Sequence, residues 1–284
     1  MRPKTTRRIF LRNTARGMTA AALASAVSTT HIAEAGFLGS NQTKLKLGMA
    51  SYTFREFGLE QTLSMTKRLG LERIAFKDFH LPLDSPAEQI RATAARVRQE
   101  GLELYGCGVV YMKTRAEVDR AFDYAREAGM SVIIGVPEHA LVSYVEQKIR
   151  EYGIKVAIHN HGPGDEVYPT PQSAYDRIKA LDPRFGLCVD VGHTQRAGVD
   201  PARSILALAD RVLDVHIKDV TAATGEGRTV EMGRGVIDLP AVCRALRSIR
   251  YGGTVAFEFE KDGKDPLPGV AESVGYVRGV LAAL

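Results

Sequence analysis

Residues 185–219, FGLCVDVGHTQRAGVDPARSILALADRVLDVHIKD, decide the fold of this 284-residue chain. Two short apolar runs, Phe185–Asp190 and Val212–Ile217, lie on either side of a longer connecting stretch. Short β-like runs that alternate with helical stretches are typical of a parallel sheet covered by helices. The segment therefore predicts one strand–helix–strand unit.

The same alternation continues on both sides of this segment, from Leu45 to the C-terminal region. Apolar residues in the connections recur every three or four positions, as in Ile90, Ala94 and Val97, which indicates helices. The expected strands are Leu45–Ser51, Arg73–Lys77, Glu103–Val109, Ser131–Val136, Lys155–His159, Phe185–Asp190, Val212–Ile217 and Thr254–Phe259. Eight such units predict an α/β fold, a single-domain (β/α)8 TIM barrel over residues 36–284, with an open doubly wound sheet as the alternative.

The first 35 residues form a separate segment. Thr6-Arg7-Arg8-Ile9-Phe10-Leu11-Arg12 is a twin-arginine pattern, an apolar run from Met18 to Val27 follows, and Ala33-Glu34-Ala35 has the small-x-small form of a cleavage site. We expect residues 1–35 to be a twin-arginine signal peptide, read by the twin-arginine export machinery, that places the protein in the periplasm. A disordered basic tail is the alternative, and the apolar run is too short for a stable membrane anchor.

The charge of the chain depends on that segment. Residues 1–35 hold six basic residues and one acidic residue, so their removal brings the formal charge of +5 to zero. A neutral barrel lacks the basic face that nucleic-acid binding requires, so we expect no nucleic-acid partner. Cys107, Cys188 and Cys243 are too widely spaced for a zinc ribbon or a disulfide framework, and we interpret them as core thiols.

Polar residues follow most of the expected strands. In (β/α)8 barrels the active site lies at the carboxyl ends of the strands. The strand ends here read Lys77-Asp78-Phe79-His80, Glu138-His139, His159-Asn160-His161, Asp190-Val191-Gly192-His193, His216-Ile217-Lys218-Asp219 and Glu258-Phe259-Glu260. Ionised groups at the top of a barrel need partners. A shared divalent cation is one such partner, and salt-bridged structural groups are the other interpretation. Mixed histidine and carboxylate ligands suit manganese, zinc, cobalt or iron better than calcium.

These strand ends resemble a known family. Cys188–His193, Asp214–Asp219 and Phe257-Glu258, in that order, are similar to the xylose isomerase-like TIM-barrel superfamily, often labelled sugar phosphate isomerase/epimerase. The resemblance covers nearly all of residues 36–284. It implies that Asp190, His216 and Glu258 ligate a divalent metal such as Mn, Zn, Co or Mg.

The fourth ligand departs from the family pattern. Many members have a glutamate at the end of strand 5, where this chain has His159. The ion then takes either His159 or a substitute, Glu138 or His161. We favour His159 because it follows Val156 by the same three residues that separate Asp190 from Leu187.

The remaining site residues follow from their positions. His193 matches a substrate-contacting position of related epimerases, and we expect Lys77, His80 and His161 to contact substrate as well. The expected catalytic residues are Glu258, Lys218 and Glu138. Lys218 has the strongest case among the lysines, because it shares a strand face with His216 and a fixed cation stabilises the negative charge of an enediolate.

The expected function is metal-dependent isomerisation or epimerisation of a sugar, by removal of a proton next to a carbonyl through an enediolate. In sugar epimerases of the superfamily two glutamates do this work, and this chain lacks the one on strand 5. A lyase or hydratase acting on a keto-sugar or 3-keto-glycoside is therefore the alternative. A non-catalytic carbohydrate-binding protein is an alternative of another class, although the chain has no tryptophan for sugar stacking. We expect a small carbohydrate as partner, a free or oxidised sugar rather than a phosphorylated one, and a homo-oligomer as one assembly state.

Overall fold

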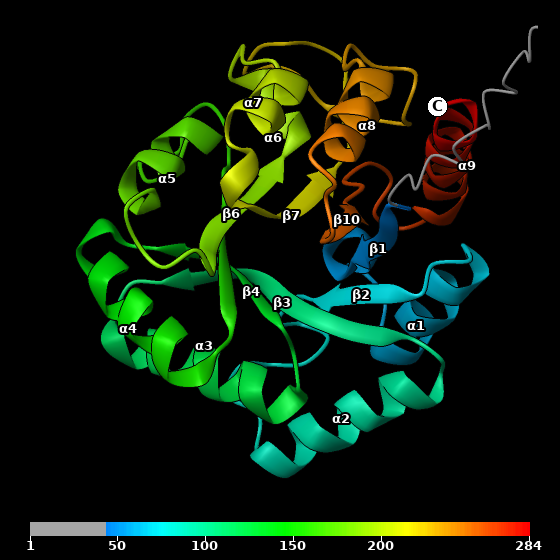
Figure 1. Ribbon diagram of the computed structural model, residues 1–284. Coiled ribbons are helices and arrows are strands. Elements are labelled where there is room, and N and C mark those ends of the chain that lie inside the picture. The colour runs from blue at the N-terminus through cyan, green and yellow to red at the C-terminus, as the bar shows by residue number, and fades with distance from the viewer. Residues whose placement is uncertain (1–43) are drawn as a thin grey trace, which may run out of the picture. The chain divides into compact units, whose positions relative to one another are not determined.

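Eight parallel strands close into a barrel in the computed structural model, which describes residues 44–284. Around the barrel the strands follow the order β1-β10-β7-β6-β5-β4-β3-β2, and helices surround them (Figure 1). The strands are β1 (Lys46–Ala50), β2 (Arg73–Phe76), β3 (Glu103–Met112), β4 (Val132–Pro137), β5 (Lys155–His159), β6 (Phe185–Asp190), β7 (Val212–Ile217) and β10 (Thr254–Phe257). The predicted (β/α)8 barrel is confirmed, while the expected signal peptide 1–35 and its boundary at residue 36 lie outside the described residues.

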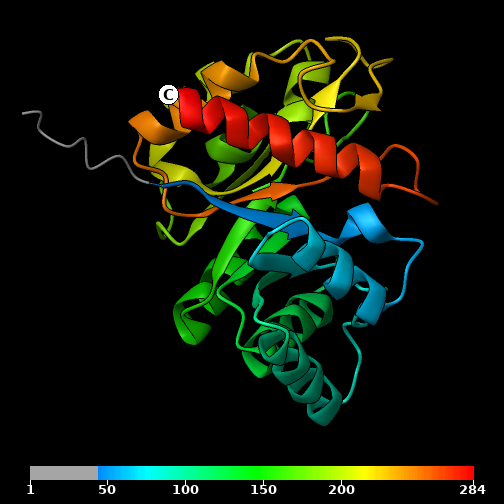
Figure 2. The same ribbon diagram turned by 90° about the vertical axis from the view of Figure 1, so that its right-hand side faces the viewer.

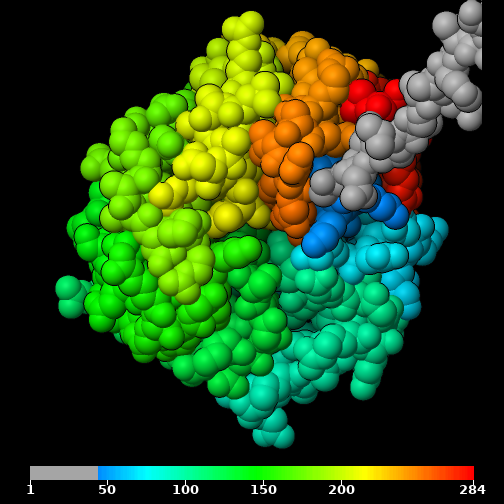
Figure 3. All heavy atoms as spheres, viewed as in Figure 1, coloured from blue at the N-terminus to red at the C-terminus, as the bar shows by residue number. Residues whose placement is uncertain are grey.

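The barrel closes where the first and last strands of the sequence meet. Residues 46–49 of β1 pair in parallel with residues 254–257 of β10. Figure 3 shows the blue atoms of the first strand region against the orange atoms near β10 on the face of the molecule in view. This pairing leaves the barrel without an open sheet edge, as the fold requires.

The strand limits differ from the prediction where tertiary pairing decides them. The expected limits of β5, β6 and β7 are confirmed. Strand β3 runs on to Met112, because Val110–Met112 pair with the end of β4 after a register shift. Strand β10 ends at Phe257, two residues early, since the backbone N–H of Phe259 donates to the Thr53 hydroxyl at 3.0 Å instead of to a neighbouring strand.

Helices fill the connections between the strands. They are α1 (Leu59–Arg68), α2 (Ala87–Gln99), α3 (Arg115–Ala128), α4 (Val142–Tyr152), α5 (Pro171–Ile178), α6 (Val191–Arg196), α7 (Pro201–Ala207), α8 (Leu239–Ser248) and α9 (Leu267–Ala283). Gly129 ends α3 with φ of 72°, a left-handed conformation that favours glycine. None of the helices among residues 44–284 combines the length and apolar character needed to cross a membrane.

A short antiparallel hairpin follows β7 and was not expected from the sequence. Strand β8 (Asp219–Val220) pairs with β9 (Thr229–Val230), and the loop 221–228 joins them. Strands of two residues are too short to show a periodic pattern, so the sequence could not reveal them. The hairpin lies at the carboxyl end of the barrel, where it forms part of the wall of the site described below.

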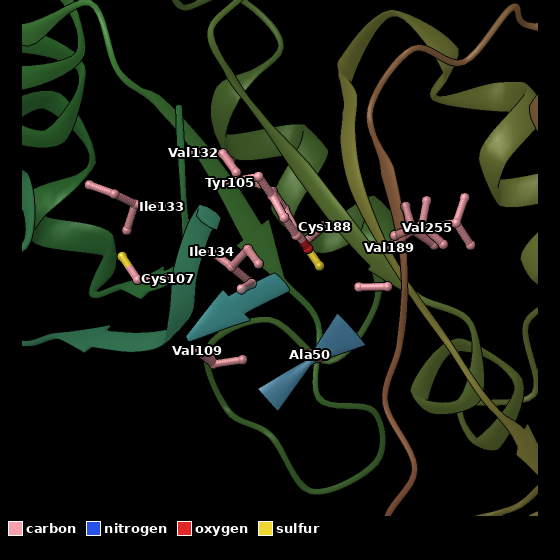
Figure 4. Close-up of a cluster of buried hydrophobic side chains, with 14 of the residues drawn as sticks. Ala50, Tyr105, Cys107, Val109, Val132, Ile133, Ile134, Cys188, Val189 and Val255 are labelled. Carbon is pink, nitrogen blue, oxygen red and sulfur yellow. The ribbon is translucent and has the colours of Figure 1, made fainter. Parts of the chain in front are cut away.

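The core extends from the barrel interior to the helices. Figure 4 shows a cluster of buried side chains contributed by several strands, among them Tyr105, Ile134, Cys188 and Val255. The three cysteines are buried and free, which confirms the interpretation as core thiols. Burial raises the pKa of the Cys107 thiol to about 12, so it stays protonated. Helix α9 lies along the side of the molecule near β1 and β10 (Figure 2) and buries Val270, Val274 and Val277, among other residues.

Candidate functional site

Four polar residues meet where strands β5, β6, β7 and β10 end. These strands are neighbours in the barrel, and Asp190 on β6 lies opposite His216 on β7 in the strand register. Each of the four residues offers one ligand atom, and these atoms all lie within 4.8 Å of one another. The residues are His159, Asp190, His216 and Glu258, all of them buried. The structure thus brings together the four residues expected as metal ligands.

The chemistry of this cluster fits a divalent cation. All four ring nitrogens of His159 and His216 are buried and have no hydrogen-bond partner among the described residues. Buried polar atoms normally have hydrogen-bond partners or ligate a metal, so these four nitrogens indicate a partner that the protein itself does not supply. His159 Nε2 lies 3.4 Å from Asp190 Oδ2, and His216 Nδ1 lies 3.3 Å from Glu258 Oε2. Two imidazoles and two carboxylates are a donor set that zinc, manganese and cobalt accept.

An ammonium group lies inside the same cluster. Lys218 Nζ is 3.0 Å from Asp190 Oδ2 and 2.6 Å from Glu258 Oε2, and it also contacts Glu260. Burial alone would lower the pKa of Lys218, but the carboxylates of Asp190 and Glu258 outweigh it and hold the pKa well above its usual value. Lys218 is therefore a buried, charged counter-ion of two of the four expected ligands.

The same ion pairs set the pKa values of the two carboxyl groups, Asp190 and Glu258. Burial would raise the pKa of Asp190 and of Glu258, but the Lys218 ammonium outweighs it in both cases, and both pKa values lie well below the usual range. Both groups are therefore ionised, as metal ligands must be. Glu260 was not among the expected site residues, although its position two residues after Glu258 predicts that the two side chains point the same way.

The pKa values of the two histidines are shifted in opposite directions. Burial lowers the pKa of His159 to about 3, against the opposing effect of its contact with Asp190, so this ring is neutral and can donate an electron pair. Burial also acts to lower the pKa of His216, but the Glu258 carboxylate outweighs it and raises this pKa. On the other side of the His216 ring, Nε2 lies 3.7 Å from Asp214 Oδ2.

Asp190 is fixed in place by the start of helix α6. Its Oδ1 accepts the backbone N–H of His193 at 2.7 Å, which leaves Oδ2 directed to the cluster. The backbone N–H of Asp190 donates to Asn160 Oδ1 at 3.0 Å, and the Asn160 amide donates to the Thr194 hydroxyl at 3.1 Å. Asn160 and Thr194 are positioning residues that the sequence did not reveal, because their partners are distant in the chain.

A histidine pair lies next to the cluster on the β5 and β6 side. The ring of His161 is centred 4.5 Å from that of His159 and 5.7 Å from that of His193. Its Nε2 lies 3.1 Å from the hydroxyl of Tyr111, a half-exposed residue. Burial lowers the pKa of His161, with the neighbouring His193 as the next cause, so the ring is neutral at pH 7. A neutral, partly accessible imidazole here can accept a proton.

A cavity of about 510 Å³ opens beside the cluster. Basic side chains predominate in its lining, which also includes residues of the β8–β9 hairpin. The lining contains His193, Arg196, Lys218, Arg228, Glu260 and Lys261. A larger cavity, of about 1100 Å³, lies at the opposite end, where strands β1 to β3 begin. It contains none of the clustered histidines, and the carboxyl end is where barrel enzymes react, so the smaller cavity is the candidate substrate site.

Three residues expected in the site do not join the cluster. Lys77 Nζ donates to the Val109 carbonyl at 2.8 Å and pairs with Asp78. His80 is buried, and both of its ring nitrogens have partners within the protein. Glu138 lies outside the four-residue cluster and precedes a short 3₁₀ helix. The four-residue cluster and the 510 Å³ cavity beside it include none of the three, so the expected substrate contacts of Lys77 and His80 and the expected catalytic role of Glu138 stay predictions.

Asp219, which follows Lys218, organises the loop after the hairpin. Its carboxylate accepts the backbone N–H groups of Gly233 at 2.9 Å, Gly235 at 3.0 Å and Ile237 at 3.2 Å. A fully buried carboxylate with these donors holds residues 233–237 against the end of β7. The backbone conformation of the glycine-rich segment 233–237 is therefore fixed by hydrogen bonds to the Asp219 carboxylate.

Comparison with known proteins agrees with the fold. A model of the xylose isomerase-like TIM barrel family matches residues 32–280. The rhizopine catabolism protein MocC of Rhizobium meliloti is 26% identical over 145 residues, 46% of this chain and 44% of that protein. The inosose dehydratase of Lactiplantibacillus plantarum is 32% identical over 130 residues, 39% of this chain and 42% of that protein. The chain thus spans less than half the length of these curated relatives.

Solved structures share the fold over most of the chain. The IolI protein with a bound zinc atom is 18% identical with a TM-score of 0.72, covering 84% of this chain and 99% of that one. An L-ribulose 3-epimerase is 17% identical with a TM-score of 0.67, covering 84% of this chain and 95% of that one. Proteins similar to this chain therefore include both dehydratases and epimerases.

Proposed function

This chain belongs to the xylose isomerase-like TIM barrel family, and from that premise we propose that it is a dehydratase, a carbon–oxygen lyase acting on a small keto-sugar or keto-polyol. The observation that carries the proposal is the buried cluster of His159, Asp190, His216 and Glu258 with its unpartnered imidazole nitrogens. These four residues would hold a divalent ion, which when bound supplies a Lewis acid beside the substrate carbonyl. Zinc, manganese, cobalt and magnesium are the candidate ions.

The asymmetry of the acid–base groups favours dehydration. A two-carboxylate epimerase needs a second glutamate on β5, where this chain has His159, and a pKa of about 3 makes that ring a poor base. His161 is the better base, because it is neutral, partly accessible and next to the cluster. On the other side of the cluster Lys218 presents a positive charge, which suits an oxygen that becomes negative as the proton leaves.

The proposed reaction balances with these groups. His161 takes the proton from the carbon next to the carbonyl, and the electron pair of that C–H bond forms a carbon–carbon double bond. The hydroxyl on the adjacent carbon leaves with one proton as water. His193 and Lys218 both line the cavity, where either can hydrogen-bond to that departing oxygen.

The likeness to inosose dehydratase supports a cyclic or open-chain polyol with one ketone as substrate class. The basic lining of the 510 Å³ cavity suits a substrate rich in oxygen atoms. A non-catalytic carbohydrate-binding protein would have no use for a buried set of four ionisable ligands, whose assembly is energetically expensive.

Isomerisation or epimerisation is the second candidate. It shares the proton-removal step, but a proton then returns to a carbon atom and no hydroxyl leaves. The position of Glu258 and Lys218 across the cluster from His161 favours it, because return of a proton to the opposite face needs a group there. The likeness to an L-ribulose 3-epimerase supports the same candidate.

Product analysis in deuterated water separates the two candidates. Metal-loaded residues 36–284 are incubated with inososes, free ketoses and 3-keto-glucosides, and the products are followed by mass spectrometry and NMR. Loss of one water establishes the dehydratase. A product of unchanged formula with deuterium on carbon establishes the isomerase or epimerase instead, and unchanged substrates in every case contradict both.

We also propose export by the twin-arginine route, supported by the pattern Arg7-Arg8 ahead of an apolar run. The full chain and an Arg7→Lys, Arg8→Lys variant are expressed in a bacterium and fractionated. Periplasmic full chain and cytoplasmic variant are expected. Equal distribution of the two proteins contradicts the proposal.

A further inference from the structure

The ammonium group of Lys218 contacts two of the residues that would ligate a divalent ion. Its Nζ is 3.0 Å from Asp190 Oδ2 and 2.6 Å from Glu258 Oε2, and those carboxylates belong to the four-residue cluster. The side chain is 2% exposed, so water contributes little to the solvation of its charge. In the absence of a metal, the ammonium neutralises carboxylates that would otherwise be buried without a counter-ion.

The two cations exclude each other on electrostatic grounds. Two carboxylates with one ammonium carry a net negative charge, and a divalent ion in place of the ammonium makes the same pair neutral. Both cations together would share the same two carboxylates inside a buried site, where repulsion between like charges is strong. Metal binding at this cluster therefore requires Lys218 to move.

A second acceptor for the displaced ammonium is already in contact with it. Glu260 also pairs with Lys218 Nζ, it lies outside the four-ligand set, and its side chain is 34% exposed. Both Lys218 and Glu260 line the 510 Å³ cavity. A lysine held by Glu260 alone would present its ammonium to that cavity.

We propose that the Lys218 ammonium is a built-in competitor of the divalent ion: it holds Asp190 and Glu258 when no metal is bound and passes to Glu260 when metal binds. Metal binding thereby delivers a cation to the substrate cavity. The inference rests on the metal site of the proposed function and is independent of which reaction that site serves.

Zinc affinity of the metal-free protein tests the competition directly. Wild type, Lys218→Met and the control Lys261→Met are titrated with Zn²⁺ by calorimetry, with a competing chelator where binding is tight. Lys261 is the matched control because it lines the same cavity but pairs with Glu231, outside the cluster. We expect Lys218→Met to bind zinc at least about tenfold more tightly than wild type, and Lys261→Met to bind as wild type does.

Equal or weaker zinc affinity of Lys218→Met overturns the competition, as does a similar gain in Lys261→Met. Absence of zinc binding in wild type and Lys218→Met overturns the metal site as well. Intact zinc binding with no reaction on any substrate contradicts the proposed function alone. Thermal unfolding of each metal-free protein shows that the compared variants are folded.

Glu260→Gln tests the transfer by a double-mutant cycle. It removes the second acceptor, so we expect it to weaken zinc binding severalfold in the wild-type background and to have little effect in Lys218→Met. Because Lys218→Met is expected to change affinity in the opposite direction, a general loss of structure cannot imitate the pair of results. An equal loss of zinc affinity in wild type and in Lys218→Met would mean that Glu260 acts only through its own charge. That result would refute the transfer of the ammonium to Glu260.

Discussion

The aliphatic stem of Lys218 passes over Gly192, and a Cβ added to Gly192 would lie 2.6 Å from Lys218 Cδ. Gly192 lies in the first turn of α6, two residues after the Asp190 that Lys218 contacts. The close approach explains why this position has no side chain: the stem of the buried lysine takes up that space. The path of Lys218 into the cluster thus depends on a glycine that precedes it by 26 residues in the sequence.

Gly192→Ala should displace Lys218 from Asp190. We expect it to lower the free energy of unfolding by about 1–3 kcal/mol, the usual cost of overpacking a filled site. Urea denaturation of the metal-free protein measures the change. Gly275→Ala is the control, because nothing lies within 4 Å of a Cβ there and its helix tolerates alanine. Equal stability of Gly192→Ala and wild type would contradict the close approach.

Asp190→Asn and His216→Ala should each abolish stoichiometric zinc binding. Each removes a ligand from a cluster whose four ligand atoms lie within 4.8 Å of one another. Metal content after gel filtration, measured by mass spectrometry, gives the result. His139→Ala is the control, since His139 is exposed and contacts the Val167 carbonyl outside the cluster. Retention of one equivalent of zinc by both ligand variants would refute the site.

The fourth ligand can be decided by two separate substitutions. We expect His159→Ala to lower zinc affinity at least about tenfold, since loss even of outer-shell partners costs this much. Glu138→Ala should leave zinc affinity unchanged, because its side chain is outside the cluster. The reverse pattern would return Glu138 to the ligand set and move the ion toward β4.

His161→Asn should slow the reaction without removing the metal. If His161 is the base, its loss should reduce kcat by roughly 10²- to 10⁴-fold, the usual contribution of general acid–base catalysis. Zinc content should remain that of wild type, because His161 is not in the cluster. Tyr111→Phe, which removes only the hydroxyl at 3.1 Å from His161, should have a much smaller effect. Unchanged kcat in His161→Asn would exclude it as the base.

His80 should make the stability depend on pH. Its Nε2 lies 3.0 Å from the Phe57 carbonyl and its Nδ1 lies 2.8 Å from the Ser51 hydroxyl, and the neutral ring satisfies both by donating to the carbonyl and accepting from the hydroxyl. Burial lowers the pKa of His80 below its ordinary value of 6.5. Because the unfolded chain then binds the proton more readily, this contribution to stability is complete above pH 6.5 and is lost as the pH falls below it.

Urea denaturation at pH 7 and pH 5 measures this dependence. We expect His80→Gln to be less stable than wild type at pH 7 by about 1–3 kcal/mol, from the lost hydrogen bonds. It should lose less stability than wild type between pH 7 and pH 5. An equal loss in both proteins would show that folding does not lower the pKa of His80.

The amino-acid sequence by itself determined the fold and most of the site. Alternating strand and helix periodicity is a local property, and it was sufficient for the eight barrel strands and for the limits of β5, β6 and β7. Polar residues at strand ends then predicted a site at one edge of the barrel, since parallel strands bring their carboxyl ends together. The resemblance to the xylose isomerase-like superfamily implied Asp190, His216 and Glu258 as its ligands, and the structure places these three with His159.

Only the tertiary structure decided which strand-end residues act together. Lys77, His80 and Glu138 satisfy the same local pattern as the cluster residues but lie outside the cluster, although Glu138 follows β4, the neighbour of β5. The contacts of Lys218 with Asp190, Glu258 and Glu260 join β7 to β6 and to the end of β10. The alternation of residues along a strand predicts the direction of a side chain but not which other side chains it will contact. Those contacts depend on packing among residues far apart in the chain. The position of the Lys218 ammonium in the cluster was therefore evident only from the three-dimensional structure.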